Sequence, residues 1–265
     1  MVSTKSLFVA AFAAAFAAVV PVASACGPTV TPTLPQTGEG MSANGELNYI
    51  LTDDGKGTEL GAPAASLVLK NIAIGHGIQN YSCVDATGDP SATGALAVLY
   101  DATGLYPGTA RTGISQQIWD DLPSHLLWNK PLPLNKLASS KYGANGANPF
   151  PPPANLRLRG LPTIDFLGHH YFDPGSIPTF DLSAAGLKAS VKKLNGINAP
   201  SYADKGIVGS GAVQWLQLGD SGNGHSRGLS MVYRVATAGG VAQACLVTGV
   251  GVQSVPYTAF YWFYG

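Results

Sequence analysis

Charged side chains are scarce in this sequence, at 11% of 265 residues, against about 25% in an average soluble domain. The 15 basic and 15 acidic residues balance, so the formal net charge is zero. Without an excess of positive charge, no long-range field steers the protein toward nucleic acid or an anionic membrane. Hydrophobic residues make up 46% of the chain, which excludes a disordered polyelectrolyte. We therefore expect a globular protein without a nucleic-acid partner.

Long apolar runs are also lacking, except near the N-terminus. Lys5 precedes an uncharged apolar run at residues 7–20, Pro21 interrupts it, and Ala-Ser-Ala at 23–25 matches a small-x-small cleavage signal. The run is shorter than the ~20 apolar residues that a membrane-spanning helix needs. These features predict a signal peptide at residues 1–25. The mature protein is then expected to be secreted, outside the cell or in the cell wall, with no membrane association after signal removal.

Cysteine is limited to three residues, Cys26, Cys83 and Cys245. Export places them in an oxidising compartment, where three cysteines allow one disulfide and one leftover thiol in three possible pairings. We favour Cys83 with Cys245, because both lie at the ends of strand-like segments. A nucleophilic cysteine is the alternative, but exposed reactive thiols survive poorly outside the cell.

Glycine and proline, in contrast, are abundant. The 33 glycines and 19 prolines favour turns and short extended segments over long helices. Residues 26–61 are polar and rich in Gly, Pro and Thr, and are predicted to form an irregular N-terminal arm. Residues 62–265 are predicted to form a single β-rich domain. Its short apolar runs indicate strands at residues 66–74, 94–100, 166–172, 187–191, 213–218, 231–236 and 257–264.

The spacing of these runs, with turn residues between them, predicts an all-β and mainly antiparallel fold. We expect a single-domain β-sandwich or barrel with long irregular loops and one or two short helices. Residues 187–191 also fit one face of a helix, and we favour a strand there because the neighbouring runs are strands.

One helix is expected at residues 115–121, because Ile114, Ile118 and Leu122 lie at helical spacing. Pro123 is expected to end it. The proline-rich segment at 148–153 must be extended, since each proline fixes its own backbone and restricts the preceding residue. We interpret it as a stiff surface loop in preference to a ligand for a proline-recognition domain.

Six strings in the β-rich region resemble a known family. They are GHGIQNYSC (75–83), GALAVLYD (94–101), LGHHYF (167–172), AVQWLQL (212–218), VYRVATAGG (232–240) and VPYTAFYWFYG (255–265). In order and spacing, residues 62–265 resemble exported fungal proteins catalogued as domain-of-unknown-function family three-four-five-five. That family includes appressorium-specific proteins, and some members carry the label "malate dehydrogenase". Many fungal relatives have a further cysteine where Ala102-Thr103-Gly104 stands here, which leaves the pairing of Cys26 open. The resemblance implies no catalytic residues.

A dehydrogenase activity is not supported by the residues. A dinucleotide site needs a strand, a G-x-G-x-x-G turn and a helix that holds the pyrophosphate. Residues 75–80 supply the first two glycines but not the third, and the following residues continue as a strand. We therefore expect neither a nicotinamide cofactor nor an NAD-dependent malate dehydrogenase.

Polar residues around the first glycines are the candidate ligand-binding residues: His76, Gln79, Asn80 and Tyr81. On a strand, Gln79 and Tyr81 share one face and Asn80 lies on the other. They can bind a sugar or another polar ligand, and the alternative is a buried network that fixes the strand. Asn80 also begins an N-glycosylation sequon, which we expect to be unused if the strand is buried.

Two adjacent histidines, His169 and His170, are the candidate catalytic residues, and Asp165 and Asp173 flank them. Neighbouring strand residues point to opposite faces, so the two rings cannot readily bind one metal ion, and no metal site is predicted. We expect one ring to be packed inside with a hydrogen bond and the other to lie at the rim. No G-x-S-x-G string is present to anchor a hydrolase triad.

The C-terminal aromatic run also alternates. Tyr257, Tyr261 and Phe263 share one strand face, and Phe260, Trp262 and Tyr264 share the other. An aromatic face can stack on sugar rings, but a central core strand is the favoured interpretation, because aromatic side chains dominate packing.

The sequence thus favours a non-enzymatic secreted protein of the fungal surface or host interface. Its expected partner is a cell-wall polysaccharide, another glycan or an extracellular protein. One alternative is an uncharacterised extracellular hydrolase or lyase that uses His169 or His170 with a nearby carboxylate, Asp165, Asp173 or Asp181. Another is a structural component of a wall or spore coat.

Overall fold

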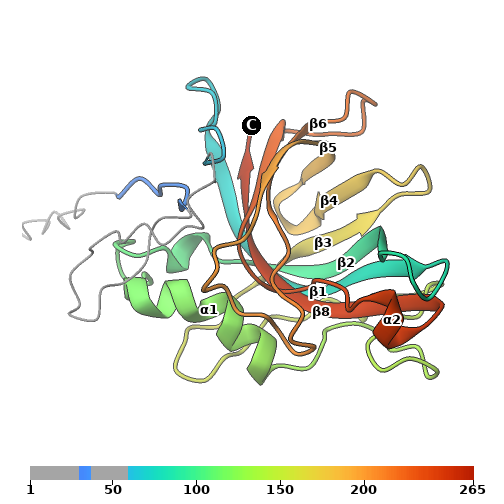
Figure 1. Cartoon of the computed structure of the whole chain (residues 1–265). Coiled ribbons are helices and arrows are strands. Elements are labelled where there is room, and N and C mark those ends of the chain that lie inside the picture. Colours follow the sequence, from blue (N-terminus) through green and yellow to red (C-terminus); the bar gives the residue numbers. More distant parts are fainter. Residues whose placement is uncertain (1–29, 37–58) are drawn as a thin grey trace, which may run out of the picture.

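The computed structural model describes residues 30–36 and 59–265, and in it eight antiparallel strands form a closed barrel (Figure 1). Each strand pairs with the next along the chain, and the last strand pairs with the first. The all-β prediction is confirmed, and of the two architectures considered the fold is the barrel. The strands are β1 (Leu69–Cys83), β2 (Ser91–Asp101), β3 (Phe166–Phe172), β4 (Pro178–Leu182), β5 (Leu187–Ile197), β6 (Trp215–Asp220), β7 (Met231–Gly239) and β8 (Gly251–Tyr264).

Short helices lie in the connections. The helices are α1 (Gln116–Asn129), α2 (Cys245–Thr248) and the 3-10 turns η1 (Thr103–Leu105) and η2 (Ser183–Ala185). Within the described ranges, no helix has the length and hydropathy of a membrane span. The predicted signal peptide, Cys26 and most of the N-terminal arm lie outside the described residues.

The two longest strands, β1 and β8, pair along nearly their whole length and separate two apolar cores. Tyr257, Tyr261 and Phe263 point into the barrel interior, as one strand face should. Phe260 and Trp262 point outward and belong to a second core on the outer surface of the barrel. All five side chains are buried, so the prediction that the aromatic run is a core strand is correct.

The outer core is covered by α1 and by the loops around it (Figure 1). Trp119 of α1 stacks on Phe260, with ring centroids 4.1 Å apart and planes 13° apart. Tyr106 meets Trp119 and Trp262 edge-on. Thr33 hydrogen-bonds to the Tyr106 hydroxyl, which brings the short segment 30–36 against this layer.

The prediction that Pro123 ends the helix is wrong, because α1 continues through it to Asn129. A proline inside a helix costs about 3 kcal/mol, since it lacks the N–H and crowds the preceding turn. Here Pro123 is buried against the barrel, and its carbonyl accepts a 2.6 Å hydrogen bond from the Thr258 hydroxyl of β8. Burial of the helix face and this bond offset the cost. Of the three residues that indicated the helix, Leu122 is buried and Ile114 packs against the outer core, whereas Ile118 is 45% exposed.

The strand at residues 187–191 is confirmed and extends to Ile197 as β5. The strand β4 was not predicted. It has five residues and begins at a proline, so its apolar pattern is too short to stand out from the surrounding turns.

The predicted disulfide between Cys83 and Cys245 is present, with Cα atoms 5.6 Å apart. Cys83 is the last residue of β1, as expected, whereas Cys245 begins α2 and is not at a strand end. The bond links the end of the first strand to the connection between β7 and β8.

Loss of this disulfide should lower stability markedly. It joins residues 162 positions apart, and the chain-entropy model assigns a loop of this size about 5 kcal/mol. Urea denaturation of the Cys83→Ala/Cys245→Ala double variant should therefore give a lower unfolding midpoint than the oxidised protein. Equal midpoints would contradict a structural role for the bond.

Glycines at two interior positions of β1 make room for an aromatic ring and for a neighbouring strand. A Cβ atom on Gly75 would lie 2.7 Å from the Tyr261 ring, and one on Gly77 would lie 1.9 Å from the Leu96 carbonyl oxygen. The G-x-G string is therefore a packing feature of an uninterrupted strand. No dinucleotide-binding turn occurs at this point.

A single added methyl group tests this interpretation. Gly75→Ala should destabilise the fold by about 1–3 kcal/mol, as overpacked core variants do. Gly146→Ala is the matched control, because nothing lies within 4 Å of an added Cβ there. Thermal unfolding followed by circular dichroism compares the two variants, and similar melting temperatures would show that Tyr261 is not confined by β1.

Candidate ligand-binding site

Six polar side chains face the interior of the barrel near one end. They come from the adjacent strands β7, β8 and β1 and from β3, which is separated from β1 by β2. Alternate residues of each strand point inward. The register places Arg234 beside Tyr261 and His170 beside Ala97, and both partners belong to the interior core. We call this set the lumen site: Gln79 and Tyr81 of β1, His170 of β3, Arg234 of β7, and Tyr257 and Tyr261 of β8.

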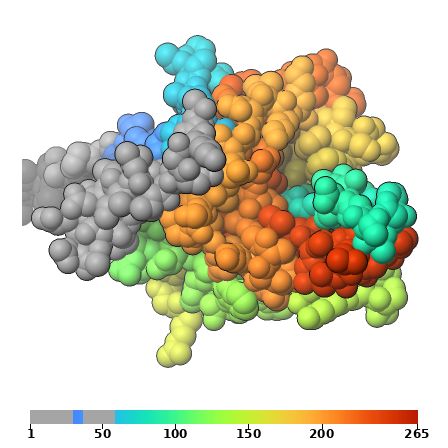
Figure 2. Space-filling view, viewed as in Figure 1, coloured from blue at the N-terminus to red at the C-terminus, as the bar shows by residue number. Residues whose placement is uncertain are grey.

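The end of the barrel near the lumen site carries the β1–β2 turn, the β3–β4 turn and the disulfide-linked α2. Figure 2 shows the surface hollowed between the teal β1–β2 turn, the red segment with α2 and the orange residues before β6. Tyr81 and Arg234 are only partly buried. Gln79 is 8% exposed, and Tyr257 and Tyr261 are fully buried. The site therefore runs from a solvent-exposed rim to a closed floor.

Arg234 carries the positive charge of the lumen site. Its Nε and Nη2 atoms donate to the Gln214 carbonyl oxygen at 3.1 and 3.0 Å. Among the residues that the structure describes, no carboxylate forms an ion pair with it. Because Arg234 is only partly buried and has no counter-ion among these residues, its guanidinium is available to bind an anionic group.

The two floor tyrosines are hydrogen-bonded to each other, with their hydroxyl oxygens 2.8 Å apart. Burial raises the pKa of both phenols, and the nearby charge of Arg234 only partly opposes that rise. Both are therefore protonated at neutral pH. One hydroxyl donates to the other, which leaves one O–H free to donate to another acceptor.

Gln79 lies beside this tyrosine pair. Its amide is close enough to Tyr257 to lower the pKa of that phenol slightly, against the larger effect of burial. Its Nε2 atom is buried and forms no hydrogen bond of normal geometry within the described residues. A buried amide donor without an acceptor is rare in folded proteins, and this one faces the same space as Arg234.

His170 supplies an acceptor. Its Nδ1 lies 2.9 Å from the Thr179 carbonyl oxygen, and because a carbonyl can only accept, we assign the proton to Nδ1 and the lone pair to Nε2. Burial, partly opposed by the hydrogen bond to Thr179 and reinforced by the charge of Arg234, lowers the pKa of His170 to about 4, so the ring is neutral. The ring also stacks on Phe180 at 4.1 Å between centroids.

The other predicted site residues lie on the outer surface of the barrel. Asn80 accepts a 2.8 Å hydrogen bond from Ser254, and its sequon stays an untested prediction. His169 stacks on Phe150 of the proline-rich loop at 4.0 Å. Burial lowers the pKa of His169, and the charge of Asp181 partly offsets this. His76 lies in an outer pocket. The four candidate ligand-binding residues are thus divided between the two surfaces of β1.

The carboxylates of Asp165 and Asp173, which flank the two histidines in the sequence, are hydrogen-bonded to other groups. Asp165 accepts from Asn155 at 2.6 Å, and Asp173 accepts from the backbone of its own turn. Within the described part of the chain, no group of three His, Cys, Asp or Glu side chains could hold a metal ion.

Sequence reasoning missed Arg234, the charged member of the site. Its signal was a single arginine at an inward position of the otherwise apolar string VYRVATAGG. Alternation along β7 places it inside the barrel, because the neighbouring Tyr233 and Val235 belong to the outer core.

A family model described as "Protein of unknown function (DUF3455)" matches residues 63–265, about three quarters of the chain. The chain belongs to the DUF3455 family. A search of curated proteins and a search of solved structures each found no match. All six residues of the lumen site lie within the DUF3455 region. The description of the DUF3455 family assigns no activity, so the function must be argued from the geometry.

The buried histidines make stability depend on pH. His76 and His170 each have a pKa of about 4 in the folded protein, because burial disfavours the charged ring, whereas an unfolded histidine titrates near 6.5. The unfolded chain therefore binds more protons between these values. Stability should fall as the pH drops from about 6.5 to 4, by up to about 3 kcal/mol for each histidine.

The His170→Gln variant isolates this effect. Its urea midpoint should fall less steeply over that pH range than the midpoint of the unaltered protein. His225→Gln is the control, because His225 is exposed. An identical pH dependence in the His170→Gln variant and in the unaltered protein would contradict a buried neutral His170.

Proposed function

We propose that this protein is a secreted, non-enzymatic binding protein whose lumen site holds the carboxylate of an acidic sugar, as found in wall or host-surface polysaccharides. The observation that carries the proposal is Arg234, a guanidinium at the barrel mouth with no carboxylate partner among the described residues. A ligand carboxylate supplies the missing counter-ion. Arginine binds carboxylates through paired, charge-assisted hydrogen bonds.

The neighbours of Arg234 favour a polyhydroxylated ligand. Gln79 offers an unpaired amide donor, the Tyr257–Tyr261 pair offers one O–H, and the neutral His170 offers an acceptor. Sugars present donors and acceptors in equal measure, so this mixture suits them better than it suits a simple inorganic anion. Phe172 lies at the rim, 36% exposed and 5.9 Å from the His170 ring, where its face can pack on a sugar ring.

Binding is favoured over catalysis for a chemical reason. General acid–base chemistry needs groups that exchange protons near the working pH. The lumen phenols have raised pKa values and His170 has a lowered one, in each case chiefly because of burial. A hydrolase or lyase centred on His169 or His170 is not favoured, since neither ring is hydrogen-bonded to a carboxylate among the described side chains.

Export is part of the proposal. The N-terminal features typical of a signal peptide and the resemblance to exported proteins support it. The Cys83–Cys245 disulfide is consistent with folding in an oxidising compartment.

Isothermal titration with oligogalacturonate and with the matching neutral oligogalactose tests the lumen site. The acidic oligosaccharide should bind and the neutral one should bind at least tenfold more weakly. Arg234→Gln should weaken acidic binding by about tenfold or more, the size expected for a charge-assisted hydrogen bond. Arg227→Gln is the control, because Arg227 contacts the Gly186 carbonyl in an exposed loop.

A second variant separates loss of binding from loss of structure. Gln79→Glu keeps the side-chain size but places a carboxylate beside Arg234, so it should remove acidic binding while circular dichroism stays unchanged. Equal affinity for both oligosaccharides, acidic binding that survives Arg234→Gln, or failure of the acidic oligosaccharide to bind would each refute the proposal.

A further inference from the structure

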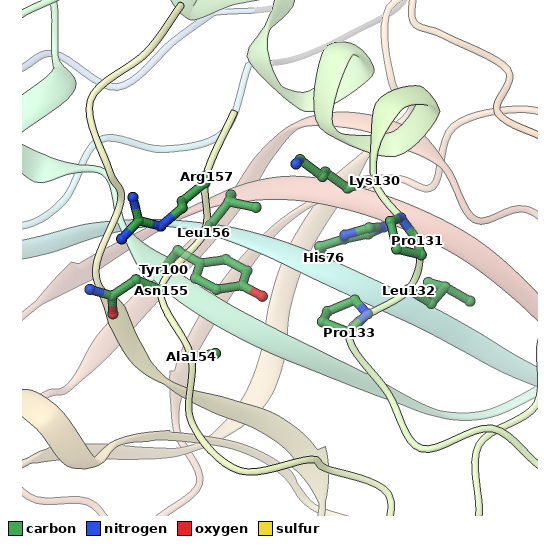
Figure 3. A pocket seen from close by; sticks show the side chains of 10 residues that line it. All are labelled: His76, Tyr100, Lys130, Pro131, Leu132, Pro133, Ala154, Asn155, Leu156 and Arg157. Atoms are coloured by element: carbon green, nitrogen blue, oxygen red, sulfur yellow. The ribbon is translucent and has the colours of Figure 1, made fainter. Parts of the chain in front are cut away.

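A second pocket lies on the outer surface of the barrel, on the opposite side of the β1–β2 wall from the lumen. His76 of β1 and Tyr100 of β2 form its floor, and the segments 130–133 and 154–157 form its walls (Figure 3). Its volume is about 320 Å³, near the lower end for small-molecule sites. The pocket shares no lining residue with the lumen site.

His76 is the unexplained residue of this pocket. It is 2% exposed, and within the described residues its ring forms no hydrogen bond. Burial alone lowers its pKa to about 4, so the ring is neutral at ordinary pH. The hydroxyl of its neighbour on β8, Thr258, donates to the Pro123 carbonyl and so has no proton left to donate to His76. Buried polar groups are normally paired, so a neutral imidazole left open toward a pocket indicates a ligand group.

The Tyr100 hydroxyl is a second polar group that faces this pocket. Figure 3 shows its hydroxyl and the His76 ring facing the same space. Tyr100 is 5% exposed, and burial raises its pKa to about 12, which keeps the hydroxyl protonated as a donor. No hydrogen bond to this hydroxyl occurs among the described side chains. One donor and one donor–acceptor ring thus face the pocket together.

Two cations border the pocket from different segments. Lys130 follows α1 and Arg157 belongs to the second wall, and Figure 3 shows them on opposite sides of the opening. Neither forms an ion pair with a carboxylate of the described residues. The nearby Asn155 does not compete for a ligand, because its side chain is already bonded to Asp165 and to the Phe166 backbone.

The walls are apolar and held in place. Pro131, Leu132, Pro133 and Leu156 line them. Leu156 exchanges two backbone hydrogen bonds with Ile164, at 2.8 and 2.9 Å. Lys130 is tied to the end of α1 through the Leu126 carbonyl. Prolines and paired backbone leave little conformational freedom to lose, so the pocket is largely preformed.

We infer that this outer pocket binds a small aromatic carboxylic acid that carries a ring hydroxyl. The ring lies between the proline and leucine walls, the carboxylate meets Lys130 or Arg157, and the hydroxyl bonds to His76 and Tyr100. An apolar slot between aliphatic side chains suits a flat ring better than a sugar, whose hydroxyls need polar partners on several sides. This site is separate from the lumen site.

The probe is 4-hydroxybenzoate, titrated by calorimetry into the full mature protein, with benzoate and 4-hydroxybenzyl alcohol as matched analogues. The hydroxyacid should bind best, since it satisfies both ends of the pocket. The Lys130→Gln/Arg157→Gln double variant should weaken hydroxyacid binding by about tenfold, as expected for loss of charge-assisted bonds. The same variant should leave 4-hydroxybenzyl alcohol unchanged.

Three further variants test the role of Tyr100 and the separation of this pocket from the lumen site. Tyr100→Phe should weaken 4-hydroxybenzoate severalfold and leave benzoate unaffected, because only one hydroxyl is removed. Lys136→Gln, an exposed lysine on the same connection, should change nothing. Arg234→Gln should also leave 4-hydroxybenzoate affinity unchanged, which distinguishes this site from the lumen site.

The inference would be overturned by the absence of saturable 4-hydroxybenzoate binding. It would equally be overturned if affinity survived both the Lys130/Arg157 and Tyr100 changes, or if it were lost with Arg234→Gln alone. Failure of the oligogalacturonate titration would leave these three outcomes unaffected, because they depend on different residues.

Discussion

The pairing of β1 with β8 is the interaction on which the rest of the structure depends. It closes the barrel, so no strand in the described sheet is left with an unpaired edge. Closure also aligns the aromatic strand β8 with β1, where Gly75 makes room for the Tyr261 ring, while Gly77 makes room for β2 on the other side of β1. Without these contacts neither the interior core nor the outer core would be complete.

The same pair of strands positions both candidate sites. Inward residues of β1 and β8 supply Gln79, Tyr257 and Tyr261 to the lumen site, and an outward residue of β1 supplies His76 to the outer pocket. Inward-facing and outward-facing residues of one strand thus serve two separate environments. The neutral state of His76 and His170 has the same cause in both places, since burial disfavours a charged ring.

Much of the local geometry followed from the period of two along each strand. Alternation correctly placed Gln79 and Tyr81 on one face and Asn80 on the other, and it separated His169 from His170. It also assigned the two faces of the C-terminal aromatic run. These predictions depend only on neighbours along the chain, so no knowledge of the fold was needed.

What could not be predicted depends on contacts between distant segments. The convergence of Arg234 on Tyr261 and His170 is set by strand order and register, which a single sequence does not reveal. The persistence of α1 through Pro123 depends on packing against β8, because local preference alone ends a helix there. The outer pocket is assembled from a strand floor and two irregular segments, whose positions no local pattern encodes.

Barrel closure also has a consequence for how the chain acquires its structure. The closing partner of β1 is the last strand to leave the ribosome, so the emerging polypeptide must wait until residue 264 has been made before its ends can join. Loop-closure entropy over such a separation makes this a slow step. A chain held open in this way would stay threadable through a narrow channel until β8 pairs with β1.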